Sequence, residues 1–322
     1  MKSFDDFQKL FTTQLSSQLL TLEVERKQVM KAFWPIVIFS LMIVAVVIFA
    51  IAMQNNWLML IGIIPLIFLI RSGIKFNKLS IAYRTNFKEH IIRKMISFID
   101  EQLNYEPKGF LSLSEFYGTK IFHQTADRYK GDDLVDGKLG ATALKFSEVH
   151  AEYKQVSYDS KGRRHETWVT IFKGILFKAD FNKNFKGNTI VLPDTLQWMG
   201  GLGTWFQKMN WNKGDLVKLE NVTFEKYFAV YSNDQVEARY ILSSTLMERI
   251  IKFREQFGKG LYMSFVDSCV NIALPISANL FEPKIFSSAM KTDYLQQYFN
   301  YLALVAGIVD ELNLNMRIWT KQ

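Results

Sequence analysis

The feature that most constrains this chain is an uncharged apolar run of 21 residues, Phe33 to Met53. At 1.5 Å per residue, a helix of that length extends about 31 Å, close to the thickness of a membrane's hydrocarbon core. A second run, Trp57 to Ile70, is shorter, and extending it to 56–74 requires Arg71 to reach outward to the headgroups. Neither run has the polar stripe of a soluble core helix. The sequence therefore predicts transmembrane helices over 33–53 and 56–74.

The three amides Gln54-Asn55-Asn56 separate the two runs and are the expected tip of a helical hairpin. Cations flank the opposite ends of both runs, and the tip carries none. The positive-inside rule then predicts that both termini are cytoplasmic. The alternative is a secretory signal ending near Ala52. Its first region would be about 30 residues long and would contain several acids, unlike the short basic region of such signals.

A basic block follows the second run. Between Arg71 and Lys94 lie seven cations and one acid, so this block holds most of the net charge of +8. The high pI of 9.3 therefore indicates a basic collar beside a bilayer with anionic headgroups, and no nucleic-acid partner is expected. The collar residues expected at the membrane surface are Arg71, Lys75, Lys78, Arg84 and Lys88.

The segments on either side of the runs, 1–32 and 75–104, have apolar residues at helical spacing. Reflecting the chain about Asn55 places Leu19 opposite Ile91 and Leu15 opposite Met95. We therefore expect the spans to continue into the cytosol as an antiparallel two-helix stalk. Alternatively, each amphipathic helix lies flat on the inner leaflet.

From Tyr105 to the end at residue 322, short strands and turns predict a cytosolic antiparallel α+β domain. The clearest unit is a hairpin of strands 143–158 and 166–181 around Ser160-Lys161-Gly162. Its expected register pairs Tyr153 with Val169 and Ala151 with Ile171. Further strands are expected at 189–192, 216–220, 227–231, 261–266 and 270–274, and helices at 244–256 and 293–312. The fold class is thus α+β: a transmembrane helical hairpin with amphipathic flanking helices, followed by this domain.

No catalytic constellation is visible in the sequence. The histidines are few, and the hairpin register places His150 and His165 on opposite faces of the sheet, where they cannot share a metal. The acids of "KGDDLVDGKLG" (130–140) lack the calcium-loop pattern and are interpreted as a solvated turn. Cys269 is interpreted as a packed thiol. We therefore expect no cofactor, no metal and no identifiable catalytic residue, and an enzyme is less well supported than a binding protein.

An aromatic segment, "LQWMGGLGTWFQKMNWNKG" (196–214), interrupts the domain. One interpretation is a flap that covers the core. The other is a loop that inserts aromatic rings at the headgroups of the inner leaflet, with lysines attracted to anionic lipid. The residues expected to contact the membrane in the second case are Trp198, Trp205, Lys208 and Trp211.

Several segments resemble a known family. They are "FKGILFKADFNKNFKGNTIVLP", "LENVTFEKYFAVYSNDQVEARYILSSTLMERI", "MSFVDSCVNIALP" and "LFEPKIF". Together with the pair of apolar runs, they resemble an uncharacterised bacterial membrane-protein family, the domain of unknown function numbered three-one-three-seven. The "DQVEARYIL" block is the most specific of these. The resemblance implies a bacterial inner-membrane protein with a cytosolic domain and implies no activity, cofactor or catalytic residue.

Two functional hypotheses follow. The first is an integral membrane protein that presents a non-enzymatic cytosolic interaction or sensing domain, with another membrane or cytosolic protein as partner. The second is a membrane-anchored enzyme, such as a hydrolase, whose site is assembled only by the fold. A deep pocket with converging polar groups and shifted pKa values would favour the enzyme.

Overall fold

The structure is a computed structural model that describes residues 6, 9, 13, 15–181, 183–194, 214–257, 260–277, 279–288, 292–312 and 314. The chain divides into two compact units. A helical unit comprises residues 2–95 and 281–299, and a sheet unit comprises residue 1, 96–280 and 300–322. The segment 281–299 thus belongs with the N-terminal helices, although it follows the sheet strands in sequence.

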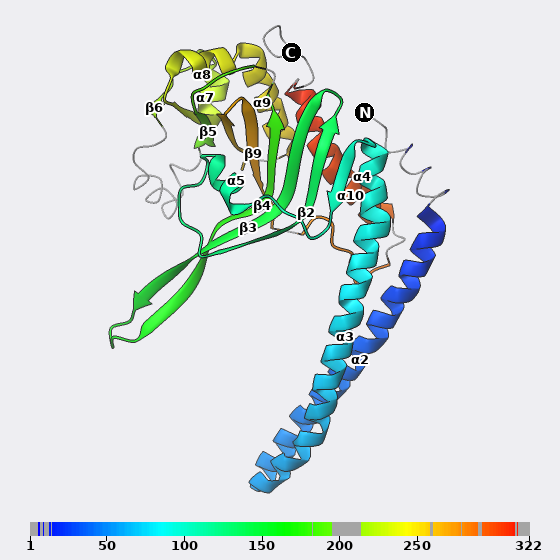
Figure 1. The fold of residues 1–322 in the computed structure, drawn as a ribbon. Coiled ribbons are helices and arrows are strands. Elements are labelled where there is room, and N and C mark those ends of the chain that lie inside the picture. The colour runs from blue at the N-terminus through cyan, green and yellow to red at the C-terminus, as the bar shows by residue number, and fades with distance from the viewer. Residues whose placement is uncertain are drawn as a thin grey trace. The chain divides into compact units, whose positions relative to one another are not determined.

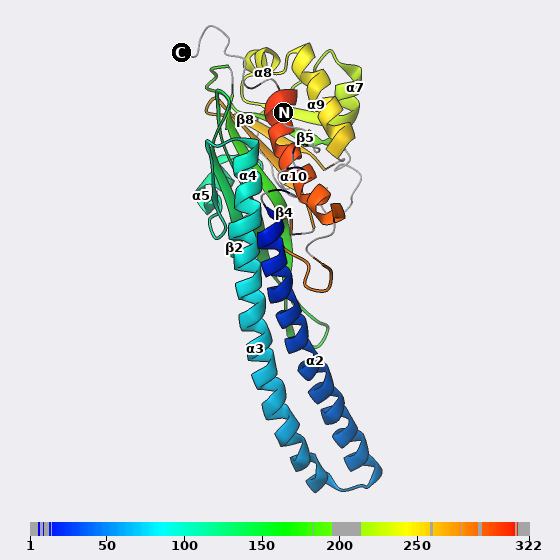
Figure 2. The ribbon, with the colours of Figure 1, turned by 90° about the vertical axis from the view of Figure 1, so that its right-hand side faces the viewer.

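The helical unit is built on two long antiparallel helices that lie side by side in both views (Figures 1 and 2). The first is α2 (Ser16–Ala52), which continues through Pro35. After the turn come a 3-10 segment η2 (Asn56–Gly62), α3 (Ile63–Phe87), a π-helical turn η3 (Lys88–Ile92) and α4 (Arg93–Ile99). The amide turn is confirmed: Gln54 has a φ of 51°, and the Asn55 side chain caps η2 by accepting from the Trp57 N–H.

The pairing of these helices follows the register expected from the sequence. The Asn86 amide donates to both carboxylate oxygens of Glu25, at 2.9 and 3.0 Å, and the Phe39 ring stacks on Phe68 with centroids 5.4 Å apart. The residues expected at the inner part of the seam are at most 1% exposed: Leu15, Leu19, Ile91 and Met95. The antiparallel helix pair is therefore confirmed.

Two helical stretches, Ser16–Ala52 and Asn56–Ile99, are long and apolar enough to cross a membrane. Only 6% of the most apolar window of each is buried, whereas the core helix of a soluble protein is mostly buried. Large apolar side chains are exposed along both, including Leu41 at 64% and Ile64 at 62%. This exposure is what a lipid environment would satisfy.

The sheet unit is a single antiparallel nine-stranded sheet in the order β1-β2-β3-β4-β9-β8-β5-β7-β6. Its strands are β1 (Leu103–Glu106), β2 (Arg128–Leu139), β3 (Thr142–Tyr158), β4 (Arg164–Asp180), β5 (Thr189–Pro193), β6 (Asp215–Leu216), β7 (Phe228–Ser232), β8 (Tyr262–Val266) and β9 (Cys269–Pro275). Its helices are α5 (Leu113–Gly118), α7 (Val222–Tyr227), α8 (Gln235–Ile241), α9 (Ser244–Phe257) and α10 (Thr292–Glu311), which runs across the boundary of the two units. The α+β class is thus confirmed (Figure 1).

One face of the sheet carries a core of aromatic and aliphatic side chains. Phe116 of α5 stacks on Phe122 at 4.5 Å, and Phe122 contacts Phe172 of β4 at 4.9 Å. Val149 and Ala151 of β3 belong to the same cluster. Because alternate residues of a strand face opposite sides, this core fixes Glu148 and His150 on the other face.

The expected hairpin is present, with one correction. Tyr153 pairs with Val169 as expected, but Ala151 pairs with Phe172 and not with Ile171. A β-bulge between Ala151 and Glu152 leaves Ile171 as the extra residue of β4, so the register on the sheet side of the bulge shifts by one. From Tyr153 onward β3 pairs only with β4, and the two strands project as an arm (Figure 1).

The interpretation of 130–140 as a solvated turn is wrong. Residues 130–139 lie in β2, which pairs with both β1 and β3, and only Gly140 is in a turn. The strand contains a bulge between Asp132 and Val135, where Asp133 adopts a φ of 60°. The Asp133 side chain is 1% exposed and accepts a hydrogen bond from the Tyr105 hydroxyl. Polar residues at a bulge resemble those of a turn, which explains the error.

Candidate functional site

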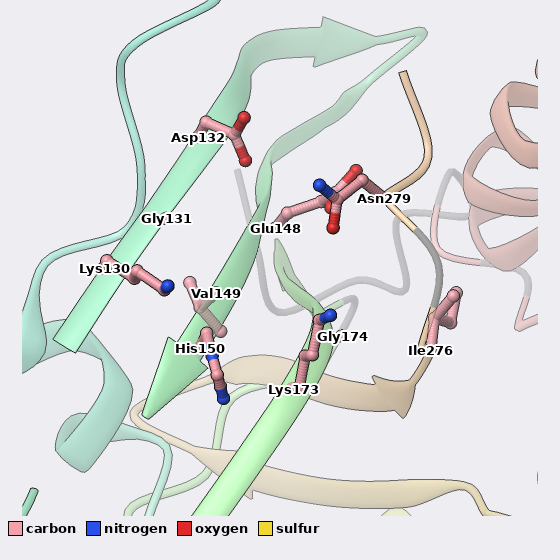
Figure 3. A pocket seen from close by; sticks show the side chains of 10 residues that line it. All are labelled: Lys130, Gly131, Asp132, Glu148, Val149, His150, Lys173, Gly174, Ile276 and Asn279. Atoms are coloured by element: carbon pink, nitrogen blue, oxygen red, sulfur yellow. The ribbon is translucent and has the colours of Figure 1, made fainter. Parts of the chain in front are cut away.

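A pocket of about 410 Å³ opens on the sheet unit (Figure 3). It lies over β2, β3 and β4 and is closed on one side by the loop that follows β9. This volume is within the range of small-molecule sites, roughly 300 to 1,000 Å³. The polar side chains that line it are Lys130, Asp132, Glu148, His150, Lys173 and Asn279.

The charged residues of the pocket form two rows across neighbouring strands. Lys130 pairs with His150 and His150 pairs with Lys173, so these three residues lie side by side and are called the cationic row below. Asp132 pairs with Glu148 on the same face of the sheet, and these two residues are called the acidic row. The two rows are two residues apart along the strand, about 7 Å. One part of the pocket is therefore cationic and the other acidic (Figure 3).

The surroundings of His150 favour the neutral form of its imidazole. Burial lowers its pKa below 6.5, and the charges of Lys130 and Lys173 lower the pKa further, while Glu152 acts in the opposite direction. Its Nε2 atom is 3.4 Å from the Thr170 hydroxyl oxygen and 3.6 Å from a carboxylate oxygen of Glu152. At neutral pH the histidine therefore adds hydrogen-bonding capacity to the cationic row without adding a third charge.

The loop that closes the pocket is fastened at both ends. The backbone N–H of Ile276 donates to the Lys173 carbonyl at 3.1 Å, and that of Leu280 donates to the Glu148 carboxylate at 2.6 Å. Between β4 and β9 the backbones come so close at Gly174 that an added Cβ would lie 2.0 Å from the Leu274 carbonyl oxygen. Glycine at this position is therefore required for the pocket wall.

Directly after Leu280 the chain enters the helical unit as the segment 281–288, called the strap below. Glu282 of the strap lies 3.1 Å from the ammonium of Lys88 and 3.4 Å from the guanidinium of Arg84. The side chain of Lys88 is 7% exposed, so this ion pair is mostly screened from water. Ion pairs of Glu282 thus connect the strap to the helix formed by α3 and η3.

The strap also contacts α2. Arg26 donates to the Ile285 carbonyl at 2.8 Å and is itself held by Glu23, whose carboxylate also accepts from the Ser288 hydroxyl at 3.1 Å. The ring of Phe286 packs edge-on against Phe33 with centroids 5.2 Å apart. Because the strap bonds to both long helices, a displacement of either helix would strain it.

The collar residues expected at the membrane surface fall into two groups. Arg71, Lys75 and Lys78 are exposed on α3. Arg84 and Lys88 instead share Glu282, and Lys88 is only 6% exposed. The aromatic candidates Trp198, Trp205, Lys208 and Trp211 lie outside the described residues.

The acids and arginine of "DQVEARYIL" have structural partners. Asp234 caps α8 by accepting from the Val236 and Glu237 N–H groups. The Glu237 carboxylate accepts from the backbone of Lys186 at 2.8 Å and of Gly187 at 2.5 Å, and Arg239 donates to the Lys218 carbonyl. This block therefore fastens the loop before β5 and the loop after β6.

Sequence analysis did not find the pocket. In the expected register His150 would face Phe172, and the bulge brings Lys173 opposite it instead. The interpretation of 130–140 as a turn predicts no strand neighbours for Lys130. The only available signal was the polar alternation of residues 128–132, typical of a strand with one exposed face.

Fold and pocket together define an α+β protein with two apolar helices, long enough to cross a membrane, and a polar pocket on its sheet. Residues 170–314 match the family model described as "Protein of unknown function (DUF3137)". This confirms, over those residues, the resemblance seen in the sequence. The match and the two helices fit a membrane protein of unknown function.

Two further comparisons add little. No curated protein matches the chain. The crystal structure of the mycobacterial trehalose monomycolate transport factor A, TtfA, is similar at 9% identity, covering 68% of this chain and 94% of that chain, with a TM-score of 0.34. A similarity at this score carries no argument about function.

Proposed function

We propose that the chain is an integral protein of a bacterial cell membrane that presents a non-enzymatic sensing domain to the cytosol, and that the sheet pocket binds the sensed ligand. One observation carries this proposal. Ile276 and Asn279 of the loop after β9 line the pocket, and directly after Leu280 the chain enters the strap, which bonds to both long helices. Ligand binding against this loop would therefore pull on a segment attached to the membrane anchor.

The anchor places the domain at the inner leaflet. The apolar stretches of α2 and α3 are largely exposed, and the cations Arg71, Lys75 and Lys78 are exposed just beyond them. Anionic lipid headgroups would attract these side chains, at about 1 kcal/mol each. Both termini and the sheet unit are then cytoplasmic, and a membrane or cytosolic protein receives the signal.

This orientation predicts a thiol-labelling pattern. A cysteine introduced as Asn55→Cys at the helix turn should react with an impermeant maleimide in intact cells, while Cys269 of the same protein should react only after the membrane is permeabilised. The control is the parent protein, which carries Cys269 alone. Labelling of Cys269 in intact cells would contradict the orientation.

The second candidate function is a membrane-anchored enzyme, favoured by one specific observation. The neutral imidazole of His150 lies 3.6 Å from the Glu152 carboxylate inside a pocket, an arrangement in which a histidine can act as a general base. Glu148, the other carboxylate beside His150, accepts a hydrogen bond from the Leu280 N–H and so holds the loop in place, which argues against a catalytic role for it. Binding is therefore the better-supported role.

The two functions differ in the fate of the ligand. The full-length protein in nanodiscs should be screened by thermal shift against a defined set of sugar phosphates, carboxylic acids, amino acids and polyamines. We expect stabilisation by members of one chemical class and, by NMR of the same samples over a day, recovery of the unchanged compound. Chemical conversion of the ligand that is lost in His150→Gln would establish the enzyme instead.

A further inference from the structure

We propose that the pocket recognises a small molecule through an acidic group, a phosphate or a carboxylate, held between the ammonium groups of Lys130 and Lys173 beside the imidazole of His150. This inference rests on the proposed ligand-binding function and names the chemical class of the ligand. It assigns the cationic row to ligand recognition.

One end of the pocket offers a ligand two cationic side chains, Lys130 and Lys173. In the part of the chain that the structure describes, neither the Lys130 nor the Lys173 ammonium group forms an ion pair or hydrogen bond. Of the two carboxylates of the pocket, that of Glu148 already accepts a hydrogen bond from the Leu280 N–H, at 2.6 Å. An anion is therefore attracted to the end of the pocket formed by Lys130, His150 and Lys173, and the acidic row lies about 7 Å away along the strands.

The geometry suits one anionic group. Neighbouring strands are about 4.8 Å apart, so the backbones of Lys130 and Lys173 lie on either side of His150, about 10 Å from each other. Lysine has a flexible four-carbon stem and three donors, so both ammonium groups can turn towards one group between them. The neutral imidazole can add an N–H donor there. An anion would also relieve the mutual repulsion of the two ammonium groups.

The rest of the pocket sets the size of the ligand. The volume of about 410 Å³ exceeds what a free phosphate ion needs, so the acidic group is the head of a larger molecule. The side chains of Ile276 and Asn279 stand on the loop side of the pocket (Figure 3) and would contact that remainder. The class is thus a small organic phosphate or carboxylate.

The test measures binding of three probes to the full-length protein in nanodiscs by isothermal titration. Glycerol 3-phosphate and succinate carry the two acidic groups, and glycerol is the neutral comparator. We expect at least one of the two anions to bind, glycerol not to bind, and the affinity to fall as salt is raised. Lys130→Gln and Lys173→Gln should each weaken binding about tenfold, because a hydrogen bond to a charged group is lost.

Matched control variants are available on the same strands. Lys138→Gln on β2 and Lys178→Gln on β4 remove the same charge at positions of similar exposure that do not line the pocket. They should leave affinity unchanged, and thermal unfolding of each variant shows that it is folded. Preference for glycerol 3-phosphate assigns a phosphate head group, and preference for succinate assigns a carboxylate.

Three results would overturn the inference: failure of both anions to bind at millimolar concentration, equal affinity in the pocket and control variants, or binding of the polyamines of the wider screen in place of the anions. In the last case the domain still binds a ligand, and the proposed function stands. If no compound of the wider screen binds either, the proposed function fails together with this inference.

Discussion

Replacing Gly174 by alanine is expected to destabilise the sheet unit by about 3 kcal/mol and to abolish ligand binding. The added Cβ would lie 2.0 Å from the Leu274 carbonyl oxygen and 2.7 Å from the Ile276 nitrogen, both backbone atoms that cannot move aside singly. The φ of 154° at this residue adds strain for any side chain. Relief requires β4 and β9 to separate beside the pocket, which can be measured by thermal unfolding and titration.

The control is Gly118→Ala, because no atom lies within 4 Å of the added Cβ and the residue ends the short helix α5. That variant should be as stable as the parent protein or slightly more stable, since alanine restricts the unfolded chain. Equal stability of the two variants would mean that the strands do not approach at Gly174 as described.

The second large effect is expected from Glu282→Ala. This change removes the carboxylate 3.1 Å from the ammonium of Lys88, whose side chain is 7% exposed, and the loss of one partner of a buried ion pair costs about 3 kcal/mol. We expect the strap to detach, which should appear as faster amide exchange and new proteolytic cleavage in residues 281–288.

Two further variants isolate the cause. Glu89→Ala on the same helix breaks a pair with Arg93 whose side chains are 40% and 44% exposed, and should cost only about 0.5 kcal/mol. Lys88→Met combined with Glu282→Leu removes both charges and should restore most of the stability. A double variant as unstable as Glu282→Ala would mean that the strap is held by something other than this charge pair.

The sequence was most informative where one local pattern determines the structure. The helix pairing followed from the position of Asn55, and the Tyr153–Val169 pairing followed from the turn around Gly162. Both depend on residues close to a single turn. The α+β class followed from the change between long apolar runs and short alternating strands.

The pocket could not be predicted because it depends on two irregularities and on long-range pairing. The bulge after Ala151 shifts β4 by one residue and so selects Lys173 as the neighbour of His150. The polar residues at the bulge in β2 resemble those of a turn, so this strand is not recognisable in the sequence. The order of the sequence places the strap in the predicted domain of residues 105–322, whereas its bonds to Arg26 and Lys88 join residues that are far apart in the sequence.

The central claim, that pocket and membrane anchor communicate through the strap, is tested most directly by hydrogen exchange of the full-length protein in nanodiscs with and without a saturating pocket ligand. We predict slower exchange in 128–132, 146–150 and 276–280, together with a change in 281–288 that is absent from the Glu282→Ala variant. Protection that ends at Leu280 in the parent protein would contradict the claim and leave a binding pocket without a signalling role.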